Sequence, residues 1–234
     1  MPRSWKGRKF LTVKVKICGL NTSAALKAAI EYGADWVGFV FFSRSPRYVS
    51  PQQAAALWQE AALRCEDSSQ HGMRALPKIV GLFVGASWQE IDSARSFLPI
   101  DIVQYYGKVD YVRAIQKQLS LPVWHSCGIS TVDDLPLETP ANGLVVEAKT
   151  QKEDPLPGGM GHSFDWSLTA QWQAPVPWLL AGGLTAKNVQ TALKQSMARA
   201  VDVSSGVETA PGKKEPALIR DFIMAAKKGL PPPA

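Results

Sequence analysis

Short apolar runs alternate with amphipathic segments along most of the chain. Residues 13–20 alternate apolar and polar side chains, a pattern typical of a β-strand, and the run stops at Gly19. Residues 22–33 are rich in alanine and close at a glycine, as expected for a capped helix. Residues 36–42 are apolar throughout, which is typical of a strand buried on both faces. The chain therefore opens with a strand–helix–strand unit.

The same alternation continues to the C-terminal end. Further strands are expected over residues 78–84, 100–107, 122–127, 143–147, 178–181 and 200–204, and further helices from 51, 88–97, 110–119, 132–135, 186–194 and 215–228. A loop rich in Gly and Pro, residues 149–163, stands where a helix should follow the sixth strand. Eight strand-then-helix units with short connections predict an α/β protein, a single-domain (β/α)8 TIM barrel.

The domain organisation follows from this repeat. Residues 13–228 are expected to form one barrel, because no linker or shift in composition divides them. Residues 1–12 are interpreted as a mobile N-terminal extension, and residues 229–234 as a frayed Pro-rich tail.

Composition narrows the function classes. Hydrophobic residues make up 46% and charged residues 20%, which is ordinary for a globular protein, and no apolar run is long enough for a membrane span. The net charge of +6 is dispersed, so an anionic small substrate or a solvated basic surface explains it better than nucleic acid does. No secretory signal is recognisable, and three cysteines without metal-ligand spacing suggest free thiols in the cytoplasm.

Two consecutive strand-to-loop turns predict a phosphate site. Gly182 and Gly183 end the seventh strand, and Ser204, Ser205 and Gly206 end the eighth. Glycines let backbone N–H groups approach a ligand, serines add hydroxyls, and the start of the helix at residue 215 could add partial positive charge. In a (β/α)8 barrel the loops after strands seven and eight commonly hold a phosphate.

Cys18 and Glu147 are the candidates for acid–base chemistry. Cys18 shares a strand face with Lys14 and Lys16, so it is expected to point into the mouth of the barrel. It is either a small core residue or, as a thiolate beside cations, a base. Glu147 ends an apolar strand, and it is either ion-paired with Lys149 or a desolvated acid with a raised pKa.

Other polar residues gather at the predicted strand ends. Gln104 and Asp202 lie on the fourth and eighth strands, and Arg47 lies in a loop where it is suited to bind a carboxylate or to stay exposed. Gly161 belongs to a Gly-rich loop that could close over a ligand. His125 and Cys127 form one H-x-C pair without further ligands, so no metal site is predicted.

Several motifs in order resemble the phosphoribosylanthranilate isomerase family of tryptophan biosynthesis. They run from about residue 13 to residue 223: Lys16-Ile17-Cys18-Gly19, Gly38-Phe39-Val40-Phe41-Phe42, Ser45-Pro46-Arg47, Gly158-Gly159-Met160-Gly161, Gly182-Gly183-Leu184 and Asp202-Val203-Ser204-Ser205-Gly206-Val207-Glu208.

The resemblance implies an Amadori rearrangement of N-(5'-phosphoribosyl)anthranilate without a cofactor or a metal. It assigns the base to Cys18, the acid to the position of Glu147, and the anthranilate carboxylate to Arg47. The phosphate would rest on Gly183, Ser204, Ser205 and neighbouring amides. The substrate is then a phosphorylated small molecule, with no nucleic acid or membrane partner, and the protein a monomer or a homodimer.

Two positions depart from the family pattern. Glu147 stands where the family has aspartate, and Tyr106 where it usually has histidine, for which His125 is a hypothetical substitute. Two other readings therefore stay open. One is a degenerate, non-catalytic phosphosugar-binding barrel, and the other is a different phosphosugar enzyme such as an indole-glycerol-phosphate synthase-like lyase, which would need further catalytic lysines.

Overall fold

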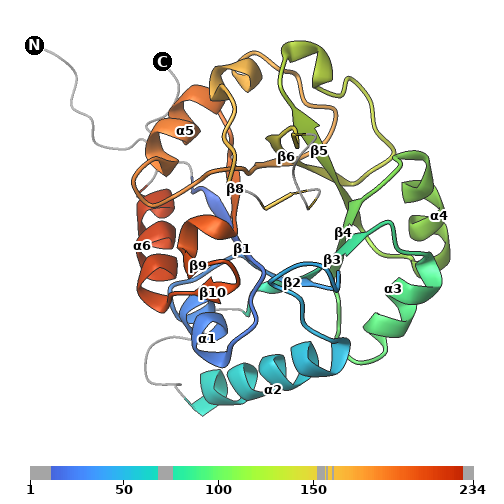
Figure 1. Cartoon of the computed structure of the whole chain (residues 1–234), viewed down its shortest axis with the longest axis vertical. Helices are drawn as coiled ribbons and strands as arrows, with labels where there is room; N and C mark the ends of the chain where they lie inside the picture. Colours follow the sequence, from blue (N-terminus) through green and yellow to red (C-terminus); the bar gives the residue numbers. More distant parts are fainter. Residues whose placement is uncertain (1–11, 68–75, 152–155, 157, 160, 229–234) are drawn as a thin grey trace, which may run out of the picture.

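Parallel strands close into a barrel in the computed structural model, and helices surround them (Figure 1). The structure describes residues 12–67, 76–151, 156, 158–159 and 161–228, so residues 1–11 of the predicted extension and the tail at 229–234 lie outside it. The barrel strands are β1 (Lys14–Cys18), β2 (Trp36–Val40), β3 (Lys78–Val84), β4 (Ile102–Tyr106), β5 (Val123–Ile129), β6 (Gly143–Ala148), β7 (Trp178–Leu180) and β8 (Ala200–Val203). Pairing of β8 with β1 completes the ring and confirms the predicted fold class.

Helices between the strands cover the outside of the ring. They are α1 (Ser23–Glu31), α2 (Pro51–Asp67), α3 (Trp88–Arg95), α4 (Asp110–Leu119), α5 (Val189–Ser196) and α6 (Pro216–Lys227). Their apolar faces pack on the outward side chains of the strands, and this shell holds most of the buried apolar residues. Burial of these faces is the main force that closes the sheet around itself.

The inside of the barrel is layered. At the amino-terminal end, Trp36 and Trp124 pack edge to face at 5.2 Å among aliphatic side chains that plug the interior. Above this plug lies a polar layer in which the Lys16 side chain is completely buried. Cys18, Val40 and Leu82 form a small cluster nearer the mouth. The apolar plug thus leaves the carboxyl-terminal mouth as the end where polar groups gather.

The structure differs from the predicted elements at two turns. The helix expected from residue 186 begins at Val189, because Asn188 is used for the turn: its Oδ1 accepts from the Thr185 N–H and its Nδ2 donates to the Gly183 carbonyl. The segment near residue 132 is a 3-10 turn, η2 (Val132–Asp134), and Asp134 Oδ2 accepts from the backbone N–H groups of Ser130 and Thr131 just before it.

A hairpin that the sequence pattern did not predict lies between β8 and α6. It consists of β9 (Glu208–Ala210) and β10 (Lys213–Lys214), and it follows the 3-10 turn η4 (Ser205–Val207). Its strands are short and largely polar, so they lack the apolar run by which the barrel strands were recognised. It separates the serine turn from α6 in sequence.

Candidate active site

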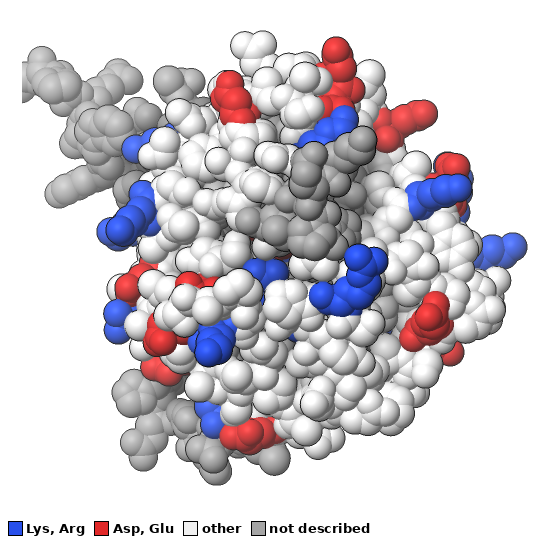
Figure 2. All heavy atoms as spheres, in the orientation of Figure 1, with Lys and Arg blue, Asp and Glu red and all other residues white. Residues whose placement is uncertain are grey.

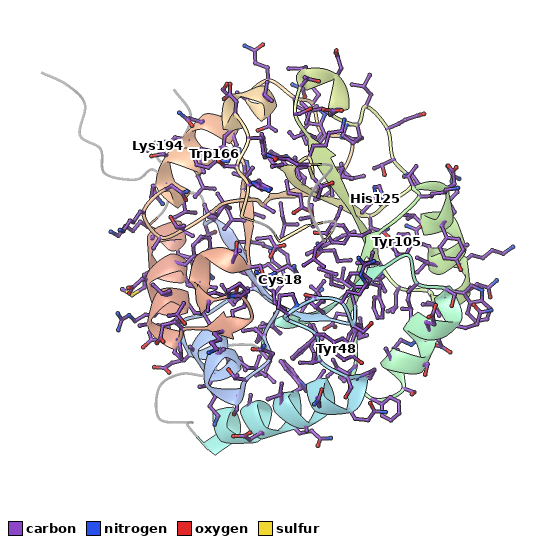
Figure 3. All side chains as sticks on the ribbon, in the orientation of Figure 1. Cys18, Tyr48, Tyr105, His125, Trp166 and Lys194 are labelled. Carbon is purple, nitrogen blue, oxygen red and sulfur yellow. The ribbon has the colours of Figure 1, made fainter. Side chains whose placement is uncertain are left out.

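A pocket at the carboxyl ends of the strands collects the residues predicted for the site. Figure 3 shows Cys18 inside the ring of strands, close to its centre. The pocket is lined by Cys18, Arg47, Gln104, Glu147, Gly161, Gly182, Gly183, Asp202, Ser204, Ser205 and Gly206, together with further residues such as Tyr106 and Gly158. All eleven predicted site residues therefore face one cavity, and their individual roles remain predictions.

The predicted phosphate turns lie side by side in this pocket. Gly182 and Gly183 have φ values of +83° and +62°, a left-handed conformation that other residues adopt at a cost. Gly206 approaches the carbonyl of Leu184 so closely that no side chain would fit there. Main-chain groups of the loops after β7 and β8 are thereby brought together without intervening side chains, as an anion site requires.

Arg47 is buried rather than exposed, and one buried carboxylate holds it. Its Nε and Nη2 donate to the two carboxylate oxygens of Glu208 at 2.8 and 2.9 Å, a bidentate geometry. Lys214 donates to the same carboxylate at 2.6 Å and to the Ser204 carbonyl at 2.9 Å. Burial works against the charge of Glu208, but Arg47 and Lys214 outweigh it, and the pKa of Glu208 is lowered. The hairpin thus connects the arginine to the phosphate turn.

Cys18 lies beside a buried lysine. Lys16 donates to Asp202 Oδ2 at 2.9 Å and to Gln104 Oε1 at 2.7 Å. Burial raises the pKa of the Cys18 thiol, whereas the positive charge of Lys16 opposes that rise. Burial also disfavours the charged form of Lys16, but Asp202 and Cys18 outweigh it and raise its pKa. A permanent cation therefore stands next to the thiol and would stabilise its ionised form.

Glu147 has the opposite surroundings to Glu208. Tyr106 donates a hydrogen bond to Glu147 Oε1 at 2.6 Å, and Glu147 is buried at the mouth while Tyr106 is partly buried. Burial raises the pKa of Glu147 to about 7, against the opposing hydrogen bond from Tyr106 and the charge of Lys16. Burial and the nearby Glu147 raise the pKa of Tyr106 well above its usual value. Glu147 is thus able to hold a proton near neutral pH and to release it to a base.

Two expectations around Glu147 are wrong. Lys149 does not pair with it but with Asp134, at 2.8 Å on the surface. His125 does not replace a histidine at position 106, because it aligns with Tyr105 on the other face of the sheet and hydrogen-bonds the Gly107 carbonyl. Neighbouring residues of a strand point to opposite faces, which separates His125 from the pocket.

Sequence reasoning assigned no role to four residues that surround the site. They are Lys16, Tyr106, Lys214 and Glu208. Lys16 carried a usable signal, since it shares the face of Cys18, two positions before it. The sequence held no signal for the partners of Glu208, because Arg47 and Lys214 are far apart in sequence and meet through the hairpin.

Among the described residues there is no cluster of three or more His, Cys, Asp or Glu side chains placed to hold a metal ion. No helix in the described part of the chain is long and apolar enough to cross a membrane. Figure 2 shows blue and red side chains interspersed over the visible face.

Comparison with known proteins gives one consistent family. Residues 15–225 match the family described as N-(5'phosphoribosyl)anthranilate (PRA) isomerase. Proteins named N-(5'-phosphoribosyl)anthranilate isomerase from Granulibacter bethesdensis and Acidiphilium cryptum are 44% and 41% identical, over 93% and 91% of this chain and 99% and 98% of theirs.

Solved structures agree with the sequence relatives. The phosphoribosyl anthranilate isomerase of Thermotoga maritima is 32% identical, with a TM-score of 0.73 over 92% of this chain and 98% of that one. A structure of such an enzyme with a reduced 1-(o-carboxyphenylamino)-1-deoxyribulose 5-phosphate is 31% identical, with a TM-score of 0.72. By sequence, fold and the residues gathered in its pocket, the chain belongs to the phosphoribosylanthranilate isomerase family.

Proposed function

We propose that the protein catalyses the Amadori rearrangement of N-(5'-phosphoribosyl)anthranilate to 1-(2-carboxyphenylamino)-1-deoxyribulose 5-phosphate, a step of tryptophan biosynthesis. The observation that carries this proposal is that a candidate base and a candidate acid line one pocket. A thiol beside a permanent cation and a carboxyl group that titrates near pH 7 line the same cavity. An aldose-to-ketose rearrangement needs one base and one acid, and no external electron carrier.

Glu147 is the proposed acid and Cys18 the proposed base. Glu147 gives its proton to the furanose ring oxygen, so the bond from that oxygen to C1' breaks and the nitrogen lone pair forms a Schiff base. The Cys18 thiolate then removes the proton from C2', and the C2'–H electron pair forms an enolamine. Tautomerisation of the enolamine gives the ketone product, so atoms and electrons balance without a cofactor.

Binding groups sit at the two ends of the substrate in this proposal. The phosphate is expected on the turn of Gly183, Ser204 and Ser205, close to the buried ammonium of Lys214. Arg47 faces the anthranilate carboxylate, because its Nη1 is directed toward Gly159 and is not among the two nitrogens that hold Glu208. The remaining residues proposed to contact the substrate are Gln104, Asp202, Gly161, Gly182 and Gly206.

The assembly and the cell compartment are parts of the same proposal. The Thermotoga maritima relative has been solved as monomers generated from a dimeric enzyme, which supports a monomer or a homodimer here. Cys18 and Cys127 are free thiols, which suits a reducing cytoplasm.

A fluorescence assay tests the reaction. Phosphoribosylanthranilate is generated in situ, and the loss of its anthranilate fluorescence is followed with purified protein and without it. Loss above the spontaneous rate that disappears in Cys18→Ala supports the isomerase. No loss in the wild type, together with binding of a reduced product analogue, would favour the degenerate phosphosugar-binding barrel.

The lyase alternative has a specific weakness in the structure. Two lysines are buried near the pocket, but Lys16 is ion-paired with Asp202 and Lys214 with Glu208. Release of carbon dioxide when the ketose 1-(2-carboxyphenylamino)-1-deoxyribulose 5-phosphate is supplied as the substrate would support the lyase.

A further inference from the structure

A line of hydrogen bonds crosses the barrel from β1 to Glu147 on β6. Lys16 Nζ donates to Gln104 Oε1 at 2.7 Å, and Gln104 Nε2 donates to Ser126 Oγ at 2.9 Å. A side-chain interaction with Ser126 lowers the pKa of Tyr106, as expected for a hydroxyl that donates toward the phenol oxygen, and Tyr106 itself donates to Glu147 Oε1 at 2.6 Å. Four strands supply these five side chains, so the barrel fixes their order.

The direction of this line is set at its lysine end. An ammonium group has donors and no acceptor, so the oxygen of Gln104 must face Lys16 and its NH2 group must face Ser126. Ser126 has one hydrogen, which remains for the oxygen of Tyr106. The O–H of Tyr106 can therefore donate to Glu147 in either protonation state of that carboxyl group.

We propose that Tyr106 is a positioning residue that holds Glu147 at the end of a one-way hydrogen-bond relay starting at Lys16. Because Oε1 always accepts the phenol hydrogen, it is the carbonyl oxygen of the acid form, and the transferable proton sits on Oε2. The relay fixes which oxygen of Glu147 donates. That the donated proton goes to the substrate rests on the proposed function.

Gly158, in the loop after β6, lies against this pair. A side chain at Gly158 would place its Cβ 2.7 Å from the Tyr106 hydroxyl and 2.9 Å from Glu147 Oε1. A Cβ at those distances would force the ends of the two side chains to shift, so the backbone of Gly158 lies against the pair. This close approach contributes to the burial that raises the pKa of Glu147.

Other groups around Glu147 influence it from several strands. They are Lys16 on β1, Cys127 on β5, Asp202 on β8 and the backbone N–H of Gly159, with Cys18 acting on Tyr106. Of the groups that favour the carboxylate form of Glu147, Tyr106 has the largest influence, through its hydrogen bond. Loss of the phenol hydroxyl should therefore raise the pKa of Glu147 further above about 7.

A titration tests the relay without turnover. The carboxyl carbon of Glu147 is followed by 13C NMR across pH and assigned by its absence in Glu147→Gln. Tyr106→Phe should raise the midpoint by about one unit, because a hydrogen bond to a charged group is lost. Ser126→Ala, which removes a single oxygen, should raise it less. An unchanged midpoint in both variants would overturn the relay.

Tyr105→Phe is the matched control. Tyr105 precedes Tyr106 on β4 but packs in the shell between strands and helices (Figure 3). The same hydroxyl is deleted there on the opposite face of the strand, so the Glu147 midpoint should not move. An equal shift in Tyr105→Phe would mean that the titration reports a general loosening of β4 and would overturn the specific role of Tyr106.

A double-mutant cycle tests the positioning role in catalysis. Tyr106→Phe should lower kcat about tenfold in the wild-type background and have little further effect in Glu147→Gln. Equal losses in both backgrounds would show that Tyr106 does not act through Glu147. If the wild type fails to isomerise while the titration still shifts, the proposed reaction is rejected and the relay is supported.

Discussion

Glu147 lines the pocket and Glu208 holds the pocket residue Arg47; both carboxyl groups are buried, yet their pKa values move in opposite directions. The pKa of Glu208 is lowered, although it is buried, because Arg47 and Lys214 share its carboxylate. That of Glu147 is raised to about 7, since its closest partner is the neutral phenol of Tyr106. Both carboxyl groups are buried, so the hydrogen-bonding partner determines the direction of the pKa shift. A cationic partner fixes a carboxylate in place, whereas a neutral donor leaves it free to exchange a proton.

The largest expected effect concerns the proton of Glu147. Glu147→Gln keeps the size of the side chain and removes its acid function, so kcat should fall about a thousandfold. The fluorescence assay measures this loss, and the far-UV circular dichroism spectrum checks that the barrel still folds. Wild-type turnover in this variant would end the assignment of Glu147 as the acid.

Glu208→Gln should damage stability rather than chemistry. Removal of one member of a buried ion pair leaves Arg47 and Lys214 insufficiently compensated, and we expect the free energy of unfolding to fall by about 3 kcal/mol. KM should rise more than kcat falls, because Arg47 loses its fixed orientation. Urea denaturation and steady-state kinetics measure the two effects. Unchanged stability together with a lost kcat would reverse the roles given to the two glutamates.

The two glutamates should also give opposite pH dependences of stability. The folded pKa of Glu147, about 7, lies above its ordinary value of 4.5, so the folded state holds this proton more tightly. Below pH 4.5 the buried Glu147 therefore does not lower the free energy of unfolding. As pH rises through about 7, its burial lowers that free energy by up to about 3 kcal/mol. Glu208 stabilises the fold above its ordinary pKa and loses this contribution as pH falls through its lowered value.

Denaturation at several pH values measures this difference. The difference in the free energy of unfolding between the wild type and Glu147→Gln should change in favour of the variant as pH rises from about 4.5 to about 8. A gap independent of pH would mean that Glu147 is ionised throughout that range.

The smallest expected effect is at Lys149. Its ammonium pairs with Asp134 on the surface, and its side chain is 58% exposed. Exposed pairs contribute little, so Lys149→Ala should leave kcat and the pH profile close to the wild type. A shifted pH profile would show that Lys149, rather than Tyr106, controls the charge of Glu147.

The fold was predictable because it depends on local periodicity. Each barrel strand is an apolar run that stops at a polar or glycine-rich turn, and the predicted runs coincide with β1 to β8 within a few residues. The β9–β10 hairpin was missed because short polar strands carry no such signal. The collection of the site residues in one pocket followed from the rule that barrel strands expose their carboxyl ends.

The partners of those residues could not be predicted. Whether Glu147 meets Lys149 or Tyr106 depends on the stagger of β4 against β6 and on side-chain length, and neither is written in the local pattern. Likewise, the bond between Arg47 and Glu208 joins residues 161 positions apart. The sequence predicted which side chains lie at the mouth of the barrel. Tertiary packing determines which of those side chains pair with each other.

The hairpin has a consequence for anyone who modifies this protein. Gly212 at its tip lies against the carbonyl of Pro46, next to Arg47, and its own carbonyl accepts from Asn21 Nδ2 at 2.8 Å. An epitope tag or a new pair of chain ends placed in this exposed turn would push on the loop that carries Arg47. The hairpin holds the Arg47 loop in place. The outer end of α4, remote from the hairpin in Figure 1, is the better place for an insertion.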